Sequence, residues 1–584
     1  MRIVALRRAV RRAPARAIAL LLSITWLTAA TCESAGQEPL SQQERAVHLL
    51  SRTTYGVRAQ DVDELLRMGA DPWLDRQLDP QSIDDTAFET RLVDAAGKES
   101  DGARAFMIMR APAPPAAGQK PPTPAQARAR MQVEALRRAV VLINPVQRLV
   151  STKLARAVHS DRQLEEVMTD FWFNHFNVYY NKGLVRAVTA DYERDAIRPY
   201  VFGRFEDMLR ATAQHPAMLI YLDNATSTAP DADGGGGLNE NYARELLELH
   251  TLGVHGGYTQ QDVIEVARAF TGWTVSTVRR SGTQVVAHAP AAAGIDFEFD
   301  PEMHDTGEKI VLGRTLPAGR GVEDGLDVLA MLAAHRSTAE HIATKLVRHF
   351  VADEPPAELV AEIATVFAET GGDLRAVTRA LFTAEAFYDR PHFRAKTKRP
   401  FEFMVSTLRA TGADIEQDRA LYNQLRAFGH LPYSEAAPTG YPTEASDWMS
   451  AGAVLARINF AMDLAAGRVQ GVKVEPERAL ADAVQAFHLA SMSGGVAPTA
   501  RVNASASVNA SAASDSVGGA DAAGTARFDA LTAALVDRLL AGVPTDALRA
   551  ALAQDLALHD AADTRALLTR AMGLALGSPD FQRY

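Results

Sequence analysis

Two carboxylates in one short stretch of the chain are the residues best suited to chemistry. Within the segment Asn239–Gly253, Asn241, Glu245 and Glu248 stand at positions i, i+4 and i+7, which places them on one face of an α-helix. One interpretation is a solvated helix face on which Arg244 pairs with Glu248 and offsets the repulsion. The other is a partly buried polar site that requires a cation or a cationic substrate.

A second polar stretch repeats this spacing. Asp170, Asn174 and Asn177 also stand at i, i+4 and i+7, so they too share one helix face. His175 instead continues an apolar stripe that includes Trp172, and we expect it to be buried. A buried histidine is more often a hydrogen-bonded core residue than a ligand.

The third candidate is the turn-rich segment Phe299–Lys309, which contains His304 next to Asp305. Both residue types bind metals, although an aspartate that caps a turn is the commoner explanation. His250 could join them, but its spacing of five from Glu245 does not place two ligands on one helix face. Zinc-protease, di-iron, P-loop, dinucleotide-binding and Gly-x-Ser-x-Gly motifs are absent from the sequence.

We expect the three stretches to converge on one pocket. There Glu245 and Glu248 would serve as metal ligand or general base, and the catalytic group would be completed by His304 and Asp305. A divalent metal would be held by Glu245, His304 and Asp305. The pocket would also contain Asp170, Asn174, His175, Asn177, Asn241 and His250.

Helix start and stop signals predict a mainly α-helical fold. Helix starts are predicted at Ser41–Glu44, Asp71–Pro72, Thr259–Asp262 and Ser337–Glu340. The run Gly371-Gly372-Asp373 predicts the end of one helix and the cap of the next. The exception is residues 274–312, where short strands are predicted at Gln284–Ala287, Asp296–Phe299 and Lys309–Leu312.

The chain divides into one large helical domain and a helical tail. The main domain is predicted over residues 41–490, with a proline-rich loop at 111–124 and a β-hairpin insertion at 274–312. Residues 491–525 are rich in Ala, Ser and Gly and predict a disordered linker, because they cannot build a core. The C-terminal helices, residues 526–584, are expected to dock on the main domain.

The N-terminus predicts export. Residues 1–32 contain six arginines and no acid, followed by an apolar run that is too short to span a bilayer comfortably. The single cysteine, Cys32, ends this run, so a lipid anchor on Cys32 and ordinary cleavage both remain open. The mature protein is then expected in the periplasm, the outer envelope or the extracellular space, without an internal disulfide.

The charge of the chain argues against nucleic-acid binding. The net charge is −10, and loss of the six N-terminal arginines lowers it to −16. An acidic surface repels phosphate backbones, and no basic stripe interleaved with aromatic residues is present. No later apolar run reaches transmembrane length, so a lipid on Cys32 would be the only membrane attachment.

Several motifs together resemble the bacterial family called domain of unknown function 1800. They occur in order between Ser41 and Gly467, and the ending Pro579-Asp580-Phe581 is also similar. The motifs are Phe171–Phe176, Asn239–Trp273, His304-Asp305-x-Gly307-x-Lys309, Ser337–Arg348, Lys396–Phe403 and Gly440-Tyr441-Pro442. The resemblance implies an exported, mainly helical protein of undetermined activity, with an exported sulfatase-like protein as a partner or a member of the same pathway.

Three functions remain open from the sequence. The first is a metal-assisted hydrolase of the cell envelope that uses Glu245, Glu248, His304 and Asp305. The second is a non-catalytic scaffold or binding partner of a sulfatase-like protein. The third is a purely structural role in the envelope.

Overall fold

The computed structural model describes residues 38–96, 146–229, 237–276, 278–281, 284–287, 295–481, 519–543, 545–556 and 563–584, with isolated positions 128, 131 and 485. The described part is mainly helical, with four small two-stranded sheets. The predicted export segment, the proline-rich loop and residues 491–518 of the predicted linker lie outside the described residues. Residues 519–525 of that predicted linker belong instead to a helix.

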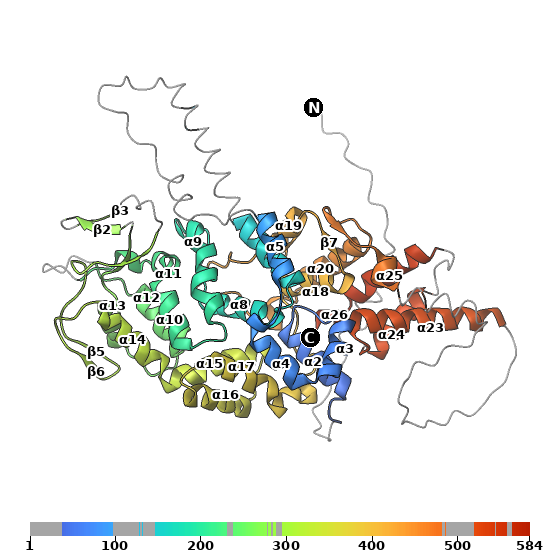
Figure 1. Ribbon diagram of the computed structural model, residues 1–584, viewed down its shortest axis with the longest axis horizontal. Coiled ribbons are helices and arrows are strands. Elements are labelled where there is room, and N and C mark those ends of the chain that lie inside the picture. Colours follow the sequence, from blue (N-terminus) through green and yellow to red (C-terminus); the bar gives the residue numbers. More distant parts are fainter. Residues whose placement is uncertain are drawn as a thin grey trace, which may run out of the picture.

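The N-terminal helices and the helices around the long central helix α8 come first in the chain (Figure 1). The N-terminal elements are α2 (Gln42–Thr53), α3 (Ala59–Met68), α4 (Ala70–Leu78), η1 (Pro80–Ser82) and α5 (Thr86–Ala96). A helix over residues 146–159 follows. The next elements are α8 (Gln163–His175), α9 (Val185–Asp191), η2 (Tyr192–Ile197), η3 (Arg198–Tyr200), α10 (Phe205–Gln214), α11 (Pro216–Tyr221), η4 (Asn224–Thr226), α12 (Asn241–Glu245), η5 (Leu246–Thr251) and α13 (Gln260–Ala269).

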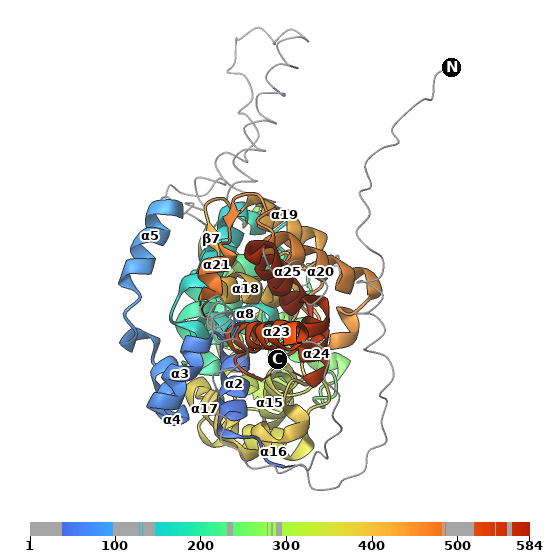
Figure 2. The same ribbon diagram turned by 90° about the vertical axis from the view of Figure 1, so that its right-hand side faces the viewer.

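The remaining helices extend along the molecule (Figure 1). They are α14 (Glu323–Ala333), α15 (Arg336–Phe350), α16 (Ala357–Glu369), α17 (Leu374–Thr383), η6 (Glu385–Tyr388), η7 (Arg390–His392), α18 (Pro400–Thr411), α19 (Arg419–Ala427), η8 (Ala445–Asp447), α20 (Ala451–Ala465), α21 (Pro476–Ala479), α23 (Gly519–Leu540), α24 (Asp546–Leu556), α25 (Thr564–Gly577) and α26 (Pro579–Gln582). Of these, α14 lies near one end of the molecule and α23 and α24 lie at the other (Figure 1). In the view along the long axis, α8 and α18 lie near the middle of the outline (Figure 2).

The predicted hairpin insertion is confirmed as three small antiparallel sheets. They pair β1 (Trp273–Val275) with β4 (Phe297–Phe299), β2 (Val278–Ser281) with β3 (Gln284–Ala287), and β5 (Lys309–Val311) with β6 (Arg314–Leu316). A fourth sheet, β7 (Asp414–Ile415) with β8 (Val472–Lys473), was not expected. Each of its strands has two residues, too few to show the alternating pattern of a strand in the sequence.

Two of the predicted capping boxes are confirmed and two other helix starts are shifted. The side chains of Ser41 and Thr259 each accept a hydrogen bond from the backbone N–H three residues later. The side chains of Glu44 and Asp262 accept in turn from the backbone N–H of the cap residue. The α4 helix begins at Ala70 rather than after Asp71. The cap of α15 is His335, whose ring accepts from the backbone N–H of Ser337, so Ser337 is already inside the helix.

The C-terminal helices pack on the end of the main domain. In α25, Gly573 and Gly577 lie one turn apart and face α20. A Cβ on Gly573 would stand 2.5 Å from the sulfur of Met462, and one on Gly577 would stand 3.5 Å from Cα of Ile458. The two glycines therefore permit a close approach of the two helices, which larger residues would prevent.

After α26, the last residues pair with the segment before α18. The backbone N–H of Tyr584 donates to the carbonyl of Lys396, and the N–H of Lys398 donates to the carbonyl of Gln582. Thr397 and Arg583 form the bridge between these bonds. This short antiparallel pairing holds the end of the chain against the start of α18.

Candidate functional site

The predicted carboxylate face lies where the helix changes its period. α12 ends at Glu245 and continues as a π-helix over Leu246–Thr251, so the spacing of Glu245 and Glu248 is no longer that of an α-helix. Asn241 is exposed and both glutamates are partly exposed. Arg244 pairs with Glu240 at 3.1 Å, not with Glu248 as predicted. Burial and the charge of Glu248 raise the pKa of Glu245.

The segment that contains His304 and Asp305 attaches the hairpin insertion to the neighbouring helices. Asp305 accepts from Arg268 at 2.8 Å, and the buried His304 ring lies 2.8 Å from the carbonyl oxygen of Thr271. Lys309 then donates to Asp324, at 2.7 Å, with both side chains enclosed. The segment for which both turn capping and metal binding were considered therefore links the loop before β5 to α13, and β5 itself to α14, through ion pairs.

The second polar stripe does reach an internal space. Asp170, Asn174 and Asn177 line a cavity of about 20 Å³. Asn174 both donates to the carbonyl and accepts from the N–H of Tyr441. Asn177 donates to the carbonyls of Glu435 and Ala437. The two amides thus fix the loop before η8 onto α8, which is a structural role.

His175 is buried, as the apolar stripe predicts, and its Nε2 lies 3.1 Å from the carbonyl oxygen of His250. His250 is buried as well. Burial, followed by the nearby Lys345, lowers the pKa of both rings, that of His250 to about 3. Both histidines are therefore neutral core residues at physiological pH.

The first and second predicted stretches lie side by side, because His175 contacts the backbone of His250, but the His304 and Asp305 segment has its own partners. No hydrogen bond or ion pair joins Glu245 or Glu248 to His304 or Asp305, all four of which lie in the described part of the chain. Across the described residues, no group of three or more His, Cys, Asp or Glu side chains is arranged to hold a metal ion. The partners that engage these side chains, Arg268 and Asp324 among them, lie too far away in the sequence to be read from local spacing.

The structure instead brings nine side chains into a row of alternating charge, which we call the charge chain. Each side chain in this row forms an ion pair with the next. The links are Glu89–Arg156 at 2.5 Å, Arg156–Glu166 at 3.8 Å, Glu166–Arg198 at 2.6 Å, Arg198–Glu193 at 3.3 Å, Glu193–Lys153 at 3.4 Å, Lys153–Asp170 at 3.0 Å, Asp170–Arg399 at 3.0 Å and Arg399–Glu402 at 2.8 Å.

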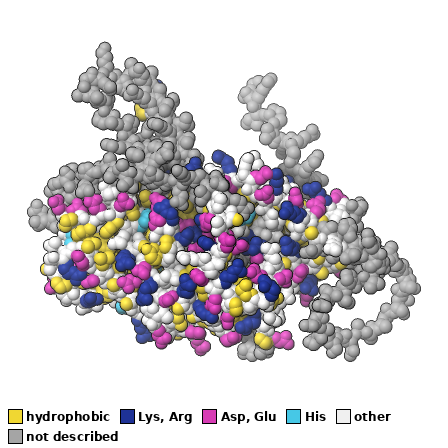
Figure 3. All heavy atoms as spheres, viewed as in Figure 1, with side chains coloured by type: hydrophobic (Ala, Val, Ile, Leu, Met, Phe, Trp, Pro, Cys, Tyr) yellow, Lys and Arg dark blue, Asp and Glu magenta, His cyan; other side chains and the backbone are white. Residues whose placement is uncertain are grey.

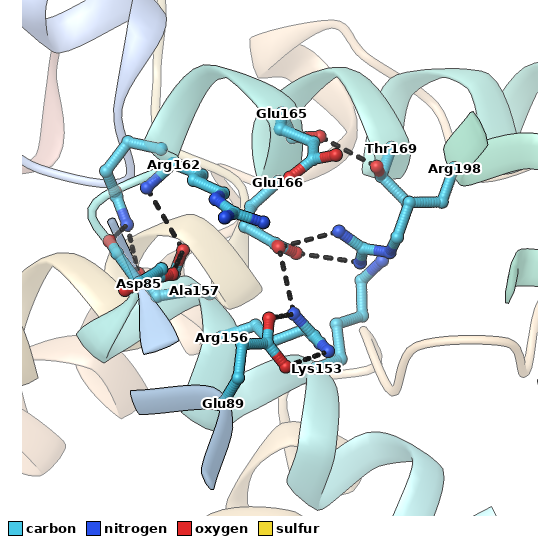
Figure 4. A network of polar contacts seen from close by, with 12 residues as sticks. Asp85, Glu89, Lys153, Arg156, Ala157, Arg162, Glu165, Glu166, Thr169 and Arg198 are labelled. Carbon is cyan, nitrogen blue, oxygen red and sulfur yellow. Dashed lines mark hydrogen bonds and ion pairs between the residues drawn. The ribbon is translucent and has the colours of Figure 1, made fainter. Parts of the chain in front are cut away.

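Figure 4 shows one end of the charge chain, where the Glu166 carboxylate lies between Arg198 and Arg156. At its other end burial opposes ionisation of Asp170, but Lys153 and Arg399 lower the pKa of that carboxyl below its usual range. For Lys153, burial is likewise outweighed by Asp170 and Glu193, and the pKa is raised. Every buried charge in this row has an opposite neighbour, as stability requires.

A larger cavity adjoins the Arg399 end of the charge chain. Its volume is about 60 Å³, which is room for about four water molecules. Helices α2, α8, α15, α18 and α23 contribute its walls, and the end of the chain from Phe581 to Tyr584 completes them. We call this space the Lys398 cavity.

Within this cavity a lysine and a serine form a direct contact. Nζ of Lys398 lies 2.7 Å from Oγ of Ser406. Lys398 stands just before the first turn of α18, and Ser406 stands further along the same helix. The pairing of residues 396–398 with 582–584 fixes the lysine backbone, and the Phe581 ring lies 4.0 Å from its Nζ.

Lys398 has no carboxylate partner in the described part of the chain. Burial, followed by repulsion from Arg394, lowers its pKa to about 7. The N-terminus of α18 also disfavours a nearby cation. A substantial fraction of Lys398 is therefore a neutral amine near pH 7, able to accept a proton from the Ser406 hydroxyl.

Two further residues pack this pair into place. A Cβ on Gly56 would stand 2.7 Å from Oγ of Ser406 and 3.0 Å from its Cα, and Gly56 adopts a positive φ of 151°. Only glycine allows the chain to pass this close. Arg394, which lines the same cavity, holds a left-handed backbone with φ of 57°. Such strained positions cluster at functional sites.

Sequence reasoning missed Lys398 and Ser406 as chemical residues. The segment Lys396–Phe403 is part of the family resemblance, but nothing in its local pattern shows that Lys398 is half-buried without an ion-pair partner. That property depends on Phe581 and on Arg394, which other segments supply. A lysine just before a helix that carries an inward-facing serine is the one signal for this pair in the sequence, and many unrelated segments share it.

Figure 3 shows one face of the outer surface. Acidic and basic side chains are interspersed there, with apolar side chains gathered over part of it. Among the described helices, none is both long and apolar enough to cross a membrane.

Comparison with known proteins gives one match. A family model described as protein of unknown function (DUF1800) matches residues 48–583. The match includes the C-terminal helices and both members of the Lys398–Ser406 pair. No curated protein and no solved structure shows significant similarity to the chain.

Proposed function

The chain belongs to the DUF1800 family, whose function is unknown, and we propose that it is a hydrolase of ester or amide bonds. In this proposal Ser406 is the nucleophile and Lys398 is the general base. The observation that carries the proposal is the 2.7 Å distance between Lys398 Nζ and Ser406 Oγ on the wall of an internal cavity.

The chemistry of the pair supports this role. A serine hydroxyl is a weak nucleophile until a neighbouring base removes its proton. A lysine performs that task in serine–lysine variants of the catalytic triad, provided that it is neutral. Lys398 meets this condition because burial lowers its pKa to about 7.

The reaction proceeds in two balanced steps. Lys398 accepts the Ser406 proton while Oγ bonds to the substrate carbonyl carbon. The bond to the leaving group then breaks, and the leaving group takes the proton from the Lys398 ammonium. Water next attacks the acyl-serine and gives its proton to Lys398. Ser406 leaves with that proton, and the acid product is released.

The small cavity limits what can react. Its volume of about 60 Å³ accepts a short acyl group but not a long chain. The bulk of a larger substrate would have to remain outside. A hydrolase that removes short acyl groups from a larger molecule fits this geometry best.

This site differs from the metal-assisted site expected from the sequence. Asp305 is paired with Arg268, and Asp324 with Lys309, so neither carboxylate offers a free pair of oxygens. We therefore place the reaction at Ser406 rather than at Glu245, Glu248, His304 and Asp305.

We further propose that the hydrolase acts outside the cytoplasm, on the basis of the arginine-rich N-terminus and the short apolar run that follows it. Cell fractionation with antibodies tests this, and a cytoplasmic protein that retains Met1 would contradict it. Loss of fatty-acid labelling in Cys32→Ser would select a lipid anchor over ordinary cleavage. The sulfatase-like partner stays a prediction.

The activity is tested with the mature full chain and 4-nitrophenyl acetate, a short ester. Ser406→Ala and Lys398→Met should each lower kcat/KM by about 10²- to 10⁴-fold. Ser82→Ala and Lys473→Met, at exposed positions, serve as matched controls and should leave it unchanged. A fluorophosphonate should label Ser406, detected by mass spectrometry, and should not label the Lys398→Met variant. Full turnover by a folded Ser406→Ala protein would refute the proposal.

A further inference from the structure

We infer that the Lys398 cavity binds a small oxyanion, held by Arg52 and Arg394, and that the substrate carries such a group beside its scissile bond. The part of this inference that concerns the substrate rests on the proposed function. The anion site itself rests on the charges that line the cavity. A carboxylate, a phosphate or a sulfate group would satisfy it.

The first observation is an imbalance of charge. Asp170, Arg399 and Glu402 line the cavity but are paired with one another. The other arginines of the lining are Arg52, Arg394 and Arg583, whereas Asp580 is the one remaining acidic side chain of the lining. Buried cations without counter-ions are costly, so a bound anion would stabilise the cavity.

The second observation concerns Arg52, which is 1% exposed. Its Nη2 donates to the carbonyl oxygen of His392 at 3.0 Å, but Nε and Nη1 have no hydrogen-bond partner. No carboxylate forms an ion pair with it among the described residues. The Tyr584 ring lies 4.5 Å from the guanidinium carbon. An oxyanion would complete the two unpartnered nitrogens of this buried guanidinium.

The third observation concerns Arg394. Its guanidinium reaches Asp580 only at 4.0 Å, too far for a hydrogen bond. The other oxygen of Asp580 already accepts from the N–H and the hydroxyl of Thr545. Arg394 is therefore weakly compensated, and its left-handed backbone holds it at the cavity.

The size of the cavity agrees with a small oxyanion. About four water molecules fill a space of about 60 Å³, and an inorganic phosphate or a short carboxylate displaces a similar volume. Arg52 and Arg394 supply the positive charge, which leaves Lys398 free to remain neutral beside Ser406.

The test uses inorganic phosphate and acetate as probes, measured by isothermal titration calorimetry on the mature full chain. We expect saturable binding of at least one probe. Arg52→Gln and Arg394→Gln should each raise its dissociation constant by about tenfold or more. Arg52→Lys, which keeps the charge, should recover part of the affinity if Arg52→Gln folds poorly. Arg336→Gln, at an exposed surface pair, should change nothing.

The controls separate this inference from the proposed hydrolase. Ser406→Ala should bind the probe as tightly as the unaltered protein while losing ester hydrolysis. If hydrolysis depends on Ser406 but neither probe binds at millimolar concentration, the anion site is wrong and the hydrolase stands. If a probe binds through Arg52 and Arg394 but Ser406→Ala retains full turnover, the anion site stands and the hydrolase is wrong. Binding that is unaffected by either arginine substitution would refute the site.

Discussion

Two lysines on the interior of this protein have opposite electrostatic surroundings. Lys153 lies between Asp170 and Glu193 in the charge chain, and these carboxylates raise its pKa despite burial. Among the described residues, the Ser406 hydroxyl is the one hydrogen-bond partner of the Lys398 amine, and burial lowers the pKa of Lys398 to about 7. Asp170 and Arg399 line both cavities, so the two environments are neighbours.

The contrast separates charges that maintain the fold from charges that are available for chemistry. A buried ion with an opposite neighbour on each side has no capacity left for a ligand, and its removal strands its partners. A buried amine without a counter-ion costs stability, and such a cost persists at sites where function requires it. The following substitutions test this division, from the largest expected effect to the smallest.

The largest loss of stability is expected from Lys153→Met. It removes the cation between Asp170 and Glu193 and leaves two buried carboxylates less compensated, which costs about 3–5 kcal/mol. Urea denaturation followed by circular dichroism measures the loss. The matched control, Lys473→Met, breaks an exposed pair with Glu416 and should cost about 1 kcal/mol or less. Equal losses for the two variants would contradict the structural role of the charge chain.

The second substitution, Lys398→Met, should change the pH dependence of stability. The pKa of Lys398 is about 7 in the folded protein and 10.5 as its ordinary value. Between these values the unfolded chain holds a proton that the folded protein does not, so the stability attributable to this group rises with pH from about 7 to 10.5. Below pH 7 its full cost is present.

Lys398→Met removes that cost and that slope. We expect the variant to be more stable than the parent at pH 6, on the order of a few kcal/mol, with a smaller advantage at pH 9. Melting temperatures at the two pH values measure the difference. Hydrolysis by the parent should rise through pH 7 to a plateau, because the base must be neutral. A constant stability difference across this range would contradict a neutral Lys398.

A smaller loss is expected from Gly56→Ala. The new Cβ would collide with Ser406, and the positive φ adds strain, so the cost is about 1–3 kcal/mol. Adding Ser406→Ala should recover only part of it, since the collision with the Ser406 backbone would remain. Gly183→Ala has a positive φ but open space around it and measures backbone strain alone. A Gly56→Ala loss no larger than that of Gly183→Ala would show that the collision with Ser406 is relieved easily.

The smallest effect is expected from Arg244→Gln, on the segment that the sequence marks as most suited to chemistry. Arg244 forms a partly exposed pair with Glu240, and its loss should cost about 0.5 kcal/mol. Hydrolysis should not change, because this pair lies outside the Lys398 cavity. A loss comparable with that of Lys153→Met would place Arg244 in an unrecognised network.

The fold could be predicted from sequence where the determining interactions are local. The capping boxes at Ser41 and Thr259 involve partners three residues apart, and the strand Gln284–Ala287 has its partner across a short turn. The helix starts at Asp71 and Ser337 were misplaced because Gly69 and His335 occupy the cap positions. The local sequence pattern does not decide which of two neighbouring residues is the cap.

The site could not be predicted in the same way. The Glu245 face depends on α-helical spacing, which ends where the π-helix begins at Leu246. Asp305 acquires Arg268 as a partner only through tertiary folding. The decisive property of Lys398 is a half-buried position without an ion-pair partner among the described residues, and only the assembled molecule reveals it. Asp170 lines a small cavity, but its ion pairs with Lys153 and Arg399 give it a role in the fold.

The pairing of residues 582–584 with 396–398 has a consequence for the order of assembly. These two segments are distant in the chain, and closing so long a loop is entropically unfavourable until other helices have packed. Phe581 and Tyr584 therefore reach the Lys398 cavity late in folding. Before that step Lys398 is open to water and remains an ordinary ammonium ion. If the proposed hydrolase is correct, a nascent or partly folded chain is inactive toward esters, and reactivity arises only with the last stage of folding.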